Sequence, residues 1–443
     1  MFKPNILKNK RLVSEALWVA FGQVSSMLLG VMFIRILTEY LDPEEYGELS
    51  LILTLGILTC VIPSAYFLSG IERMYSMAVK RKEEFEYYTA IKKMAITSGL
   101  LSLIILSLIF VVLKVGFPKY WEWHEEVFLA ALFTIVSSFS TALTFIFNAA
   151  RERSLVVFYI FIDSILKISL VLMLAYFGVI NTYTILLIYV IGVIITLIMR
   201  YLSFLKKTPK PSMARSVSST SVSTQWKNKM YQYSKPFVYF QLFTWMHTSS
   251  DRWALEMYSS TESAGLLVVL MQVGYMPAII FSGMIITYIS PILYDIYGDG
   301  KMKNKIEVHN LSIKISYYIL LITIIATMAA YFLHGLVFEM LTNERYHSVS
   351  YLLPWVVLSA GLFSIGQMLF TKLNSELRIN EIAKPKIITS LAGVFLNVIG
   401  AYFWGIEGVV FALIAFSAFY FIWMMYLSKY DKSVNTHMTF ENK

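Results

Sequence analysis

The chain has 443 residues, of which 57% are hydrophobic and only 15% are charged, and its formal net charge is +9. Because soluble globular proteins contain about 25% charged residues, this composition excludes an ordinary soluble protein and indicates a membrane protein. Apolar runs long enough to cross a bilayer as helices recur along the whole chain. Segments of strand length with alternating polarity are absent, which argues against a transmembrane β-barrel.

The apolar runs predict an all-α, polytopic protein with about twelve membrane-spanning helices. The expected spans are 12–37, 47–69, 94–115, 127–148, 155–177, 182–203, 236–258, 264–291, 314–338, 349–372, 387–403 and 406–427.

Basic residues are concentrated on every second connection between these spans. Arg151 and Arg153 lie on one such connection, whereas Glu122, Glu125 and Glu126 lie on the connection before it. By the positive-inside rule, the basic connections and both termini are expected in the cytoplasm. Because membrane topology accounts for the positive charge, we expect membrane lipids as partners and no nucleic acid.

The corner between the first two spans has a counterpart in the second half of the chain. Arg35 to Gly47 contains an arginine, a glutamate four residues later, a short acidic turn and a glycine that begins the next apolar run. Arg252 to Gly265 has the same order with one residue of offset. A repeat at nearly half the chain length indicates two related halves.

The connection at 70–93 mixes Met and aromatic residues with Lys, Arg and Glu. This mixture is typical of an amphipathic helix that lies on an anionic inner leaflet. A solvated loop explains the composition equally well, so both interpretations remain open.

Two charged residues lie within the fifth expected span. Asp163 and Lys167 are four residues apart, and the acid precedes the base, which is the favourable order for an ion pair on one helical face. A charge at the centre of a membrane helix costs about 2.5–3.5 kcal/mol on insertion scales. The pair is either a self-neutralising structural feature or part of the lining of a polar cavity.

The longest non-apolar stretch is 206–235, which contains several lysines and a Ser/Thr-rich run. Its composition predicts a flexible basic linker on the cytoplasmic side. The expected domains are therefore an N-terminal six-helix bundle at 1–205 and a C-terminal six-helix bundle at 236–443.

The seventh span carries a polar stripe, because steps of three and four residues place most of its polar side chains on one helical face. The stripe comprises Gln241, Thr244, Thr248, Asp251 and Arg252, with His247 beside it. With Asp251 one turn away, His247 is a candidate for a proton-responsive pair, although a lone histidine is more often a packed core residue. Hydrogen bonds between helices explain two further polar residues, Gln367 and Asn397.

Motifs of soluble enzymes are absent. The sequence has no Gly-rich phosphate loop, no H-E-x-x-H, no zinc-ligand spacing and no G-x-S-x-G. The single cysteine, Cys60, lies in an apolar run and predicts neither a disulfide nor a cysteine-based metal site. We therefore expect no catalytic residues, no metal site and no enzymatic activity.

Several short motifs resemble those of one transporter family. They are Leu41-Asp42-Pro43-Glu44-Glu45-Tyr46-Gly47, Ser250-Asp251-Arg252 followed by Ala264-Gly265, Arg151-Glu152-Arg153, Lys384-Pro385-Lys386, and Asn397 with Gly405-Ile406-Glu407-Gly408. Together they resemble the Wzx-type flippases of polysaccharide and lipid-linked oligosaccharide precursors, in the multidrug/oligosaccharidyl-lipid/polysaccharide exporter (MOP) superfamily. The chain differs from the family pattern at Asp42, where glycine is common.

The resemblance implies a MATE-like V of two pseudo-symmetric six-helix bundles around a cavity that opens alternately to each side. It implies undecaprenyl-pyrophosphate-linked sugar repeat units, the precursors of O-antigen, capsule or exopolysaccharide, as substrates in the inner membrane of a bacterium. A polymerase and glycosyltransferases of the same pathway are expected partners. No cofactor is expected, and H⁺ or Na⁺ is the candidate coupling ion because no nucleotide site is present.

Arg and Lys are natural partners of phosphate oxygens. The hypothesis for the substrate site is that Arg35, Lys167 and Arg252 attract the anionic head group, while Asp163 and Asp251 prevent permanent binding. His247 is a further cavity candidate, and Gln241, Gln367 and Asn397 are secondary candidates. Two alternatives remain: a MATE-like exporter of drugs or organic cations, and a membrane glycan polymerase or ligase, which the short external connections disfavour.

Overall fold

The computed structural model describes residues 10–207, 219–298, 302–376 and 378–429. Within these ranges every regular element is a helix and no strand occurs, which confirms the predicted all-α class. The chain forms two compact units, Met1–Trp245 and Met246–Lys443.

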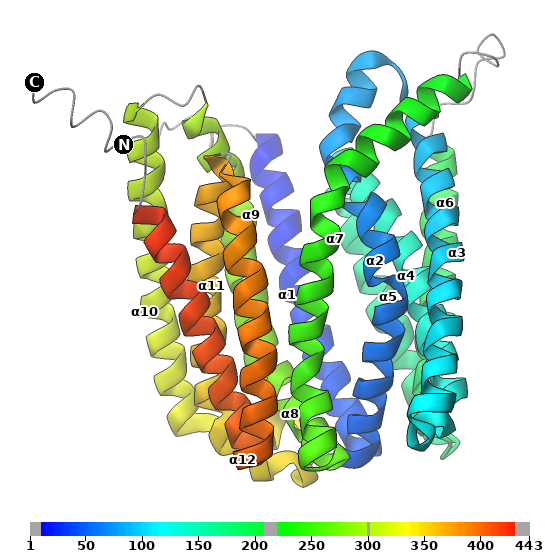
Figure 1. The fold of residues 1–443 in the computed structure, drawn as a ribbon, viewed down its shortest axis with the longest axis vertical. Helices are drawn as coiled ribbons and strands as arrows, with labels where there is room; N and C mark the ends of the chain where they lie inside the picture. Colours follow the sequence, from blue (N-terminus) through cyan, green and yellow to red (C-terminus); the bar gives the residue numbers. More distant parts are fainter. Residues whose placement is uncertain (1–9, 208–218, 299–301, 377, 430–443) are drawn as a thin grey trace, which may run out of the picture. The chain divides into compact units, whose positions relative to one another are not determined.

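The first unit contains six long helices, a short 3₁₀ helix and the first part of a seventh long helix (Figure 1). They are α1 (Lys10–Tyr40), α2 (Pro43–Arg81), α3 (Glu84–Gly116), η1 (Pro118–Trp123), α4 (His124–Ala149), α5 (Arg153–Tyr176), α6 (Thr182–Lys207) and α7 (Ser219–Tyr258), which continues into the second unit. Helix α4 is central, because it packs against both α2 and α6, while α1 packs against α5. A Cβ on Gly56 would lie 2.7 Å from the Ala130 backbone, so glycine permits the close contact of α2 with α4.

The structure replaces the expected amphipathic helix or loop at 70–93 with the ends of two long helices. Helix α2 continues to Arg81, Lys82 adopts a left-handed conformation with φ 58°, and α3 begins at Glu84. The corner is rigid because Tyr87 is fully buried and donates a hydrogen bond to the Ile71 carbonyl at 2.7 Å.

The flexible linker expected at 206–235 is helical in its second part. Residues 219–235 are the first turns of α7, while 208–218 lie outside the described residues. Trp226 and Met230 are buried in a cluster with Phe67, Ile71 and Tyr87, which attaches this end of α7 to the α2–α3 corner. Sequence composition suggested a linker because polar residues outnumber the few apolar side chains that anchor the helix.

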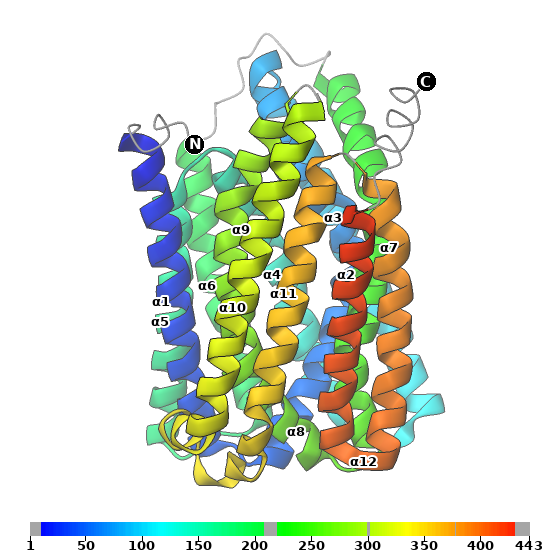
Figure 2. The ribbon, with the colours of Figure 1, turned by 90° about the vertical axis from the view of Figure 1, so that its left-hand side faces the viewer.

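The second unit begins within α7, and Figure 2 shows the helices that follow α7 from another side. Its further elements are α8 (Thr261–Leu270), the π-helical turn η3 (Met271–Tyr275), α9 (Met276–Tyr297), α10 (Met302–Leu341), the 3₁₀ helix η4 (Glu344–Leu352), α11 (Leu353–Ser375) and α12 (Ile379–Lys429). The α8–η3–α9 series forms the expected eighth span. Helix α11 is its best buried long element and packs against α9, α10 and α12.

Helix α12 contains two antiparallel segments. Gly405 interrupts it with φ 57° and ψ −132°, a conformation that favours glycine, so 387–403 and 406–427 remain separate spans as predicted. The two segments touch closely, because a Cβ on Gly408 would lie 2.0 Å from the Gly400 carbonyl oxygen.

Ten helical segments of the described chain are long and apolar enough to cross a membrane. The last of them, Lys384–Lys429, contains the turn at Gly405, and α7 is not among the ten because it carries so many polar residues. The structure therefore confirms the polytopic all-α architecture, with ten to twelve apolar helices where about twelve were expected.

Candidate functional site

Asp163 and Lys167 form an ion pair inside the first unit. The Lys167 Nζ lies 2.8 Å from an Asp163 carboxylate oxygen, and the two side chains are 19% and 25% exposed, respectively. The second Asp163 oxygen accepts a hydrogen bond of 3.4 Å from the hydroxyl of Thr196, which α6 contributes and which is fully buried. The predicted i,i+4 pairing is therefore present, and it is linked to the neighbouring helix.

Aromatic rings surround the ammonium group of this pair. Lys167 Nζ lies 5.6 Å from the ring centroid of Phe133 on α4 and 5.6 Å from that of Tyr189 on α6. The two rings also contact each other, with centroids 5.3 Å apart. Cation–π attraction at this distance stabilises a partly desolvated ammonium group.

A second cation, Arg200, was missed by sequence reasoning. It lies on α6 one turn after Thr196, interacts electrostatically with Asp163 and donates a hydrogen bond to the Ser140 hydroxyl on α4. Its guanidinium carbon lies 5.6 Å from the Tyr159 ring centroid. Arg200 lies inside the expected span 182–203, and no feature of the surrounding apolar sequence singles it out. The i,i+4 spacing of Thr196 and Arg200 is the signal that places it on the inner face.

We call Asp163, Lys167, Thr196 and Arg200 the charge cluster. It has one carboxylate and two cations, so it carries an excess of positive charge on helices that otherwise present apolar side chains. An anionic oxygen brought to this cluster would find guanidinium and ammonium donors, the groups that bind phosphate most strongly.

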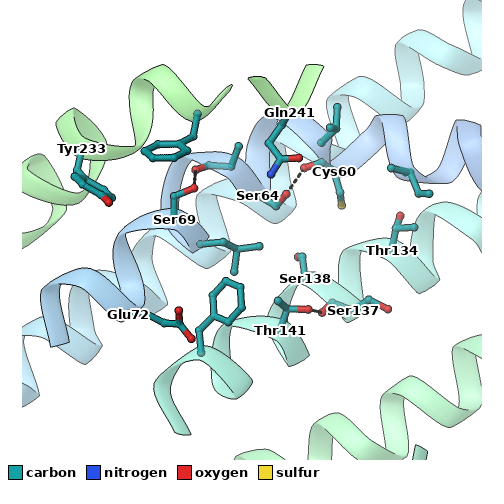
Figure 3. A pocket seen from close by; sticks show the side chains of 16 residues that line it. Cys60, Ser64, Ser69, Glu72, Thr134, Ser137, Ser138, Thr141, Tyr233 and Gln241 are labelled. Carbon is teal, nitrogen blue, oxygen red and sulfur yellow. Dashed lines mark hydrogen bonds between the residues drawn. The ribbon is translucent and has the colours of Figure 1, made fainter. Parts of the chain in front are cut away.

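Helix α4 also forms one wall of a pocket on another of its faces (Figure 3). The pocket has a volume of about 580 Å³ and is lined by α2, α4 and the first part of α7. Its aliphatic hydroxyl groups belong to Ser64, Ser69, Thr134, Ser137, Ser138 and Thr141, and Tyr233 adds a phenolic hydroxyl. Gln241, the one member of the predicted stripe that lines this pocket, lies beside Ser64, and Glu72 lies toward one end (Figure 3). Tyr233 and Phe237 line the pocket from the same helix as Gln241.

Arg35 is not drawn into the charge cluster. It pairs with Glu39 one turn later on α1, with 3.4 Å between the charged atoms, and both side chains are nearly half exposed. This geometry agrees with an arginine that extends from the helix end toward the surface of the membrane. Its role in substrate binding remains a prediction.

The compact units divide within the polar stripe of the seventh span, between Trp245 and Met246. Asp251 belongs to the second unit and accepts a hydrogen bond of 2.7 Å from the backbone NH of Arg252. The side chains of these two residues form only a long ion pair, with 3.9 Å between Nε and the carboxylate oxygen. Asn397 on α12 donates to the hydroxyl of Ser250 at 2.9 Å.

His247 is a tightly packed residue in the second unit. Its ring stacks on Phe416 with centroids 3.7 Å apart, and a Cβ on Gly393 would lie 2.1 Å from it. Within the described residues, no ion pair joins the His247 ring to Asp251. Gln367, another predicted residue, accepts a long hydrogen bond of 3.5 Å from the Tyr420 hydroxyl. Both arrangements favour packing roles for these side chains.

Among the residues that the structure describes, no group of three or more His, Cys, Asp and Glu side chains is placed to hold a metal ion.

No protein-family model matches the sequence, and no curated protein sequence matches it significantly. Solved structures do match. An inward-facing multidrug transporter of the MATE family and MOP superfamily superposes with a TM-score of 0.63 at 13% identity, over 92% of this chain and 94% of that chain. The chain has the fold of the MOP-superfamily transporters.

Two further matches have the same fold. The lipid II flippase MurJ in an inward closed conformation gives a TM-score of 0.64 at 12% identity, over 94% of this chain and 88% of its own. A MOP-superfamily transporter from Pyrococcus furiosus, described as having a binding pocket of reverse polarity, gives 0.58 at 13% identity, over 95% of both chains. At these identities the likeness establishes the fold, and the function has to be argued from the residues of this chain.

Proposed function

We propose that this protein flips polyprenyl-pyrophosphate-linked oligosaccharides from the cytoplasmic to the external leaflet of a bacterial inner membrane. The observation that carries the proposal is the charge cluster, in which two cations share one carboxylate on membrane-spanning helices. Such an excess of positive charge is costly in a membrane unless an anion compensates it. A pyrophosphate head group supplies that anion, while its isoprenoid tail remains in the lipid.

The arrangement of the cluster suits transient binding. Asp163 competes with the substrate for Lys167, and the Ser140 hydroxyl is a weaker partner that a phosphate oxygen can replace at Arg200. A bidentate guanidinium–phosphate contact is stronger than a bond to a neutral hydroxyl. The carboxylate then restores the ion pair when the head group leaves, which allows release on the other side.

The test uses purified protein in vesicles that contain a polyprenyl-pyrophosphate-linked oligosaccharide with a fluorescent sugar, and a quencher that does not cross the membrane. We expect the wild type to bring the label to both leaflets. Lys167→Gln and Arg200→Gln should slow flipping roughly 10- to 100-fold, because a hydrogen bond to a charged group contributes about 1.5–3 kcal/mol. Lys114→Gln and Arg345→Gln, which remove exposed cations outside the cluster, are the matched controls.

Failure of the wild type to move this lipid would overturn the proposal. Equal rates for the cluster variants and the controls would overturn the role of the cluster. An ion gradient is the proposed driving force, with Asp163 and Asp251 as candidate sites for H⁺ or Na⁺. Rates that ignore both a pH gradient and a sodium gradient would contradict coupling while leaving passive flipping in place.

An exporter of organic cations is the second candidate. The observation that favours it is Glu72, a carboxylate beside aromatic rings in the pocket of the first unit. The same vesicles can test it, because a lipophilic fluorescent cation should then be transported and should compete with the lipid-linked glycan. Transport of the cation without any flipping of the glycan would favour this candidate over the first.

A further inference from the structure

Four hydroxyl groups of the pocket in the first unit have their protons already engaged in hydrogen bonds to backbone carbonyls. Ser64 donates to the Cys60 carbonyl at 2.6 Å, Ser138 to the Ile135 carbonyl at 2.7 Å, and Thr141 to the Ser137 carbonyl at 2.8 Å. Thr134 likewise donates to the carbonyl of Gly56 at 2.7 Å. A hydroxyl that donates to its own backbone keeps its lone pairs for another donor. These four side chains therefore present acceptors to a molecule in the pocket.

The only charged side chain that lines the pocket is acidic, so it is also a hydrogen-bond acceptor. Glu72 is that residue, and none of the residues that line the pocket is Lys, Arg or His. The carboxylate interacts electrostatically with Arg153 near the start of α5, although Arg153 is not part of the lining. An anion inside the pocket would be repelled by the Glu72 carboxylate and by the hydroxyl lone pairs, and the Gln241 amide and Tyr233 hydroxyl would offer it only uncharged donors.

Aromatic rings complete the lining. Tyr233 and Phe237 lie on one side of α7 with ring centroids 5.5 Å apart, and Phe145 of α4 also contributes to the wall. A sugar ring has apolar C–H faces and a rim of hydroxyl donors. The aromatic rings of the pocket can stack on those faces, and the hydrogen-bond acceptors beside them can bind the hydroxyl donors. The volume of about 580 Å³ lies within the range of small-molecule sites.

We propose that this pocket is a sugar subsite that accepts neutral and amino sugars and rejects uronic acids and phosphates. The inference rests on the proposed function, since it assigns part of the same glycan cargo to a second place in the first unit. The charge cluster and the pocket lie on different faces of α4, and they have opposite polarity. The cluster is suited to the pyrophosphate, and the pocket is suited to the part of the glycan that donates hydrogen bonds.

The experiment measures binding of three soluble trisaccharides to the full-length protein in lipid nanodiscs by titration calorimetry. The probes are N,N′,N″-triacetylchitotriose, which is neutral, its deacetylated amine form, which is cationic, and trigalacturonate, which is anionic. We expect the first two to bind with a Kd of about 1 mM or better, and trigalacturonate to bind at least about tenfold more weakly.

Two substitutions test the residues. The Glu72 carboxylate should make the wild type bind the amine form more tightly than the neutral form. Glu72→Gln should remove this difference and should strengthen trigalacturonate binding roughly tenfold. Thr141→Val should weaken the neutral probe roughly 2- to 10-fold, as expected for one lost hydrogen bond. Thr144→Val is the matched control, because Thr144 makes the same bond to the carbonyl four residues earlier, at 3.0 Å, and does not line the pocket. Ser64→Ala, which removes a single atom, provides a second pocket variant if Thr141→Val does not fold.

The inference is overturned if the wild type binds none of the probes, if trigalacturonate binds as well as the neutral form, or if the pocket variants behave like Thr144→Val. It is also overturned if a lipophilic cation without hydroxyl groups binds more tightly than the sugars and ignores Thr141→Val. Flipping of the lipid-linked glycan without selective sugar binding would reject the subsite and retain the proposed function. Selective sugar binding without flipping would reject the proposed function and retain the subsite.

Discussion

The corner between α1 and α2 depends on one side chain, that of Asp42. Its carboxylate accepts a hydrogen bond of 2.9 Å from the Glu45 backbone NH, and the Glu45 carboxylate accepts one of 3.3 Å from the Asp42 NH. This reciprocal pair is a capping box, which satisfies backbone donors at the start of a helix. The counterpart in the second half uses Ser260 at the start of α8, whose hydroxyl accepts from the Ser263 NH at 3.0 Å. The sequence repeat is therefore also a repeat of helix caps.

Replacing the cap should have a graded effect on stability. Asp42→Ala should lower the free energy of unfolding by about 1 kcal/mol, because alanine is unfavourable at the N-cap position. Asp42→Gly should lower it by only about 0.3 kcal/mol, because glycine is well tolerated there. The measurement is the midpoint of thermal unfolding in detergent, with Asp42→Ser as the control that keeps an acceptor. An Asp42→Ala variant as stable as the wild type would show that packing alone fixes this corner.

Arg200 shows what a sequence does not reveal about a buried polar residue. The Asp163–Lys167 pair was predictable because both members lie on one helix, four residues apart. Arg200 meets Ser140, sixty residues earlier on α4, and this partner appears only when α4 and α6 pack together. Local spacing can identify a pair within a helix, but it carries no information about which neighbouring helix supplies the next group.

At the scale of helices, long apolar runs predicted most elements, because a run that must satisfy its backbone hydrogen bonds within a bilayer has little choice but to be helical. The corners were harder. The sharp bend at Lys82 requires a residue in the left-handed backbone conformation. A lysine in a polar stretch gives no sequence signal for that conformation. The start of α7 depends on the burial of Trp226 and Met230 against α2 and α3, a tertiary effect that overrides local composition.

The pocket could not be predicted from the sequence either, because three helices that are distant in the sequence form it.

The hairpin within α12 gives a prediction at the same scale. Gly408→Ala should destabilise the protein by about 1–3 kcal/mol, because the new methyl group would collide with the Gly400 backbone and force the two segments apart. Gly283→Ala is the matched control on α9, where no atom lies within 4 Å of the added Cβ. It should be neutral or stabilising, since Ala favours a helix by up to about 1 kcal/mol over Gly.

Both variants can be compared by their thermal unfolding midpoints in one detergent. A lower midpoint is expected for Gly408→Ala, and an unchanged or higher midpoint is expected for Gly283→Ala. Equal shifts would mean that the general loss of glycine flexibility, and not the contact between Gly400 and Gly408, determines the result.

The whole molecule should place its connections on alternating sides of the membrane. Helix α10 is one apolar segment, so Lys303 near its start and Glu344 beyond its end should lie on opposite sides. In a Cys60→Ser background, Glu344→Cys should react with a membrane-impermeant maleimide in intact cells, and Lys303→Cys should react only after permeabilisation. Labelling of Lys303→Cys in intact cells would reverse the proposed orientation.

One feature of the pocket has a practical use. The whole chain contains a single cysteine, and Cys60 lines the pocket wall, where it is only 6% exposed. Its sulfur lies 3.4 Å from the Ser102 hydroxyl of α3, so the thiol is held among packed helices. A thiol reagent applied to the unmodified protein consequently reports from this one place. The rate at which the reagent modifies Cys60 depends on how often α2, α3 and α4 separate. The unmodified protein can therefore report the opening of these helices through a single reactive site.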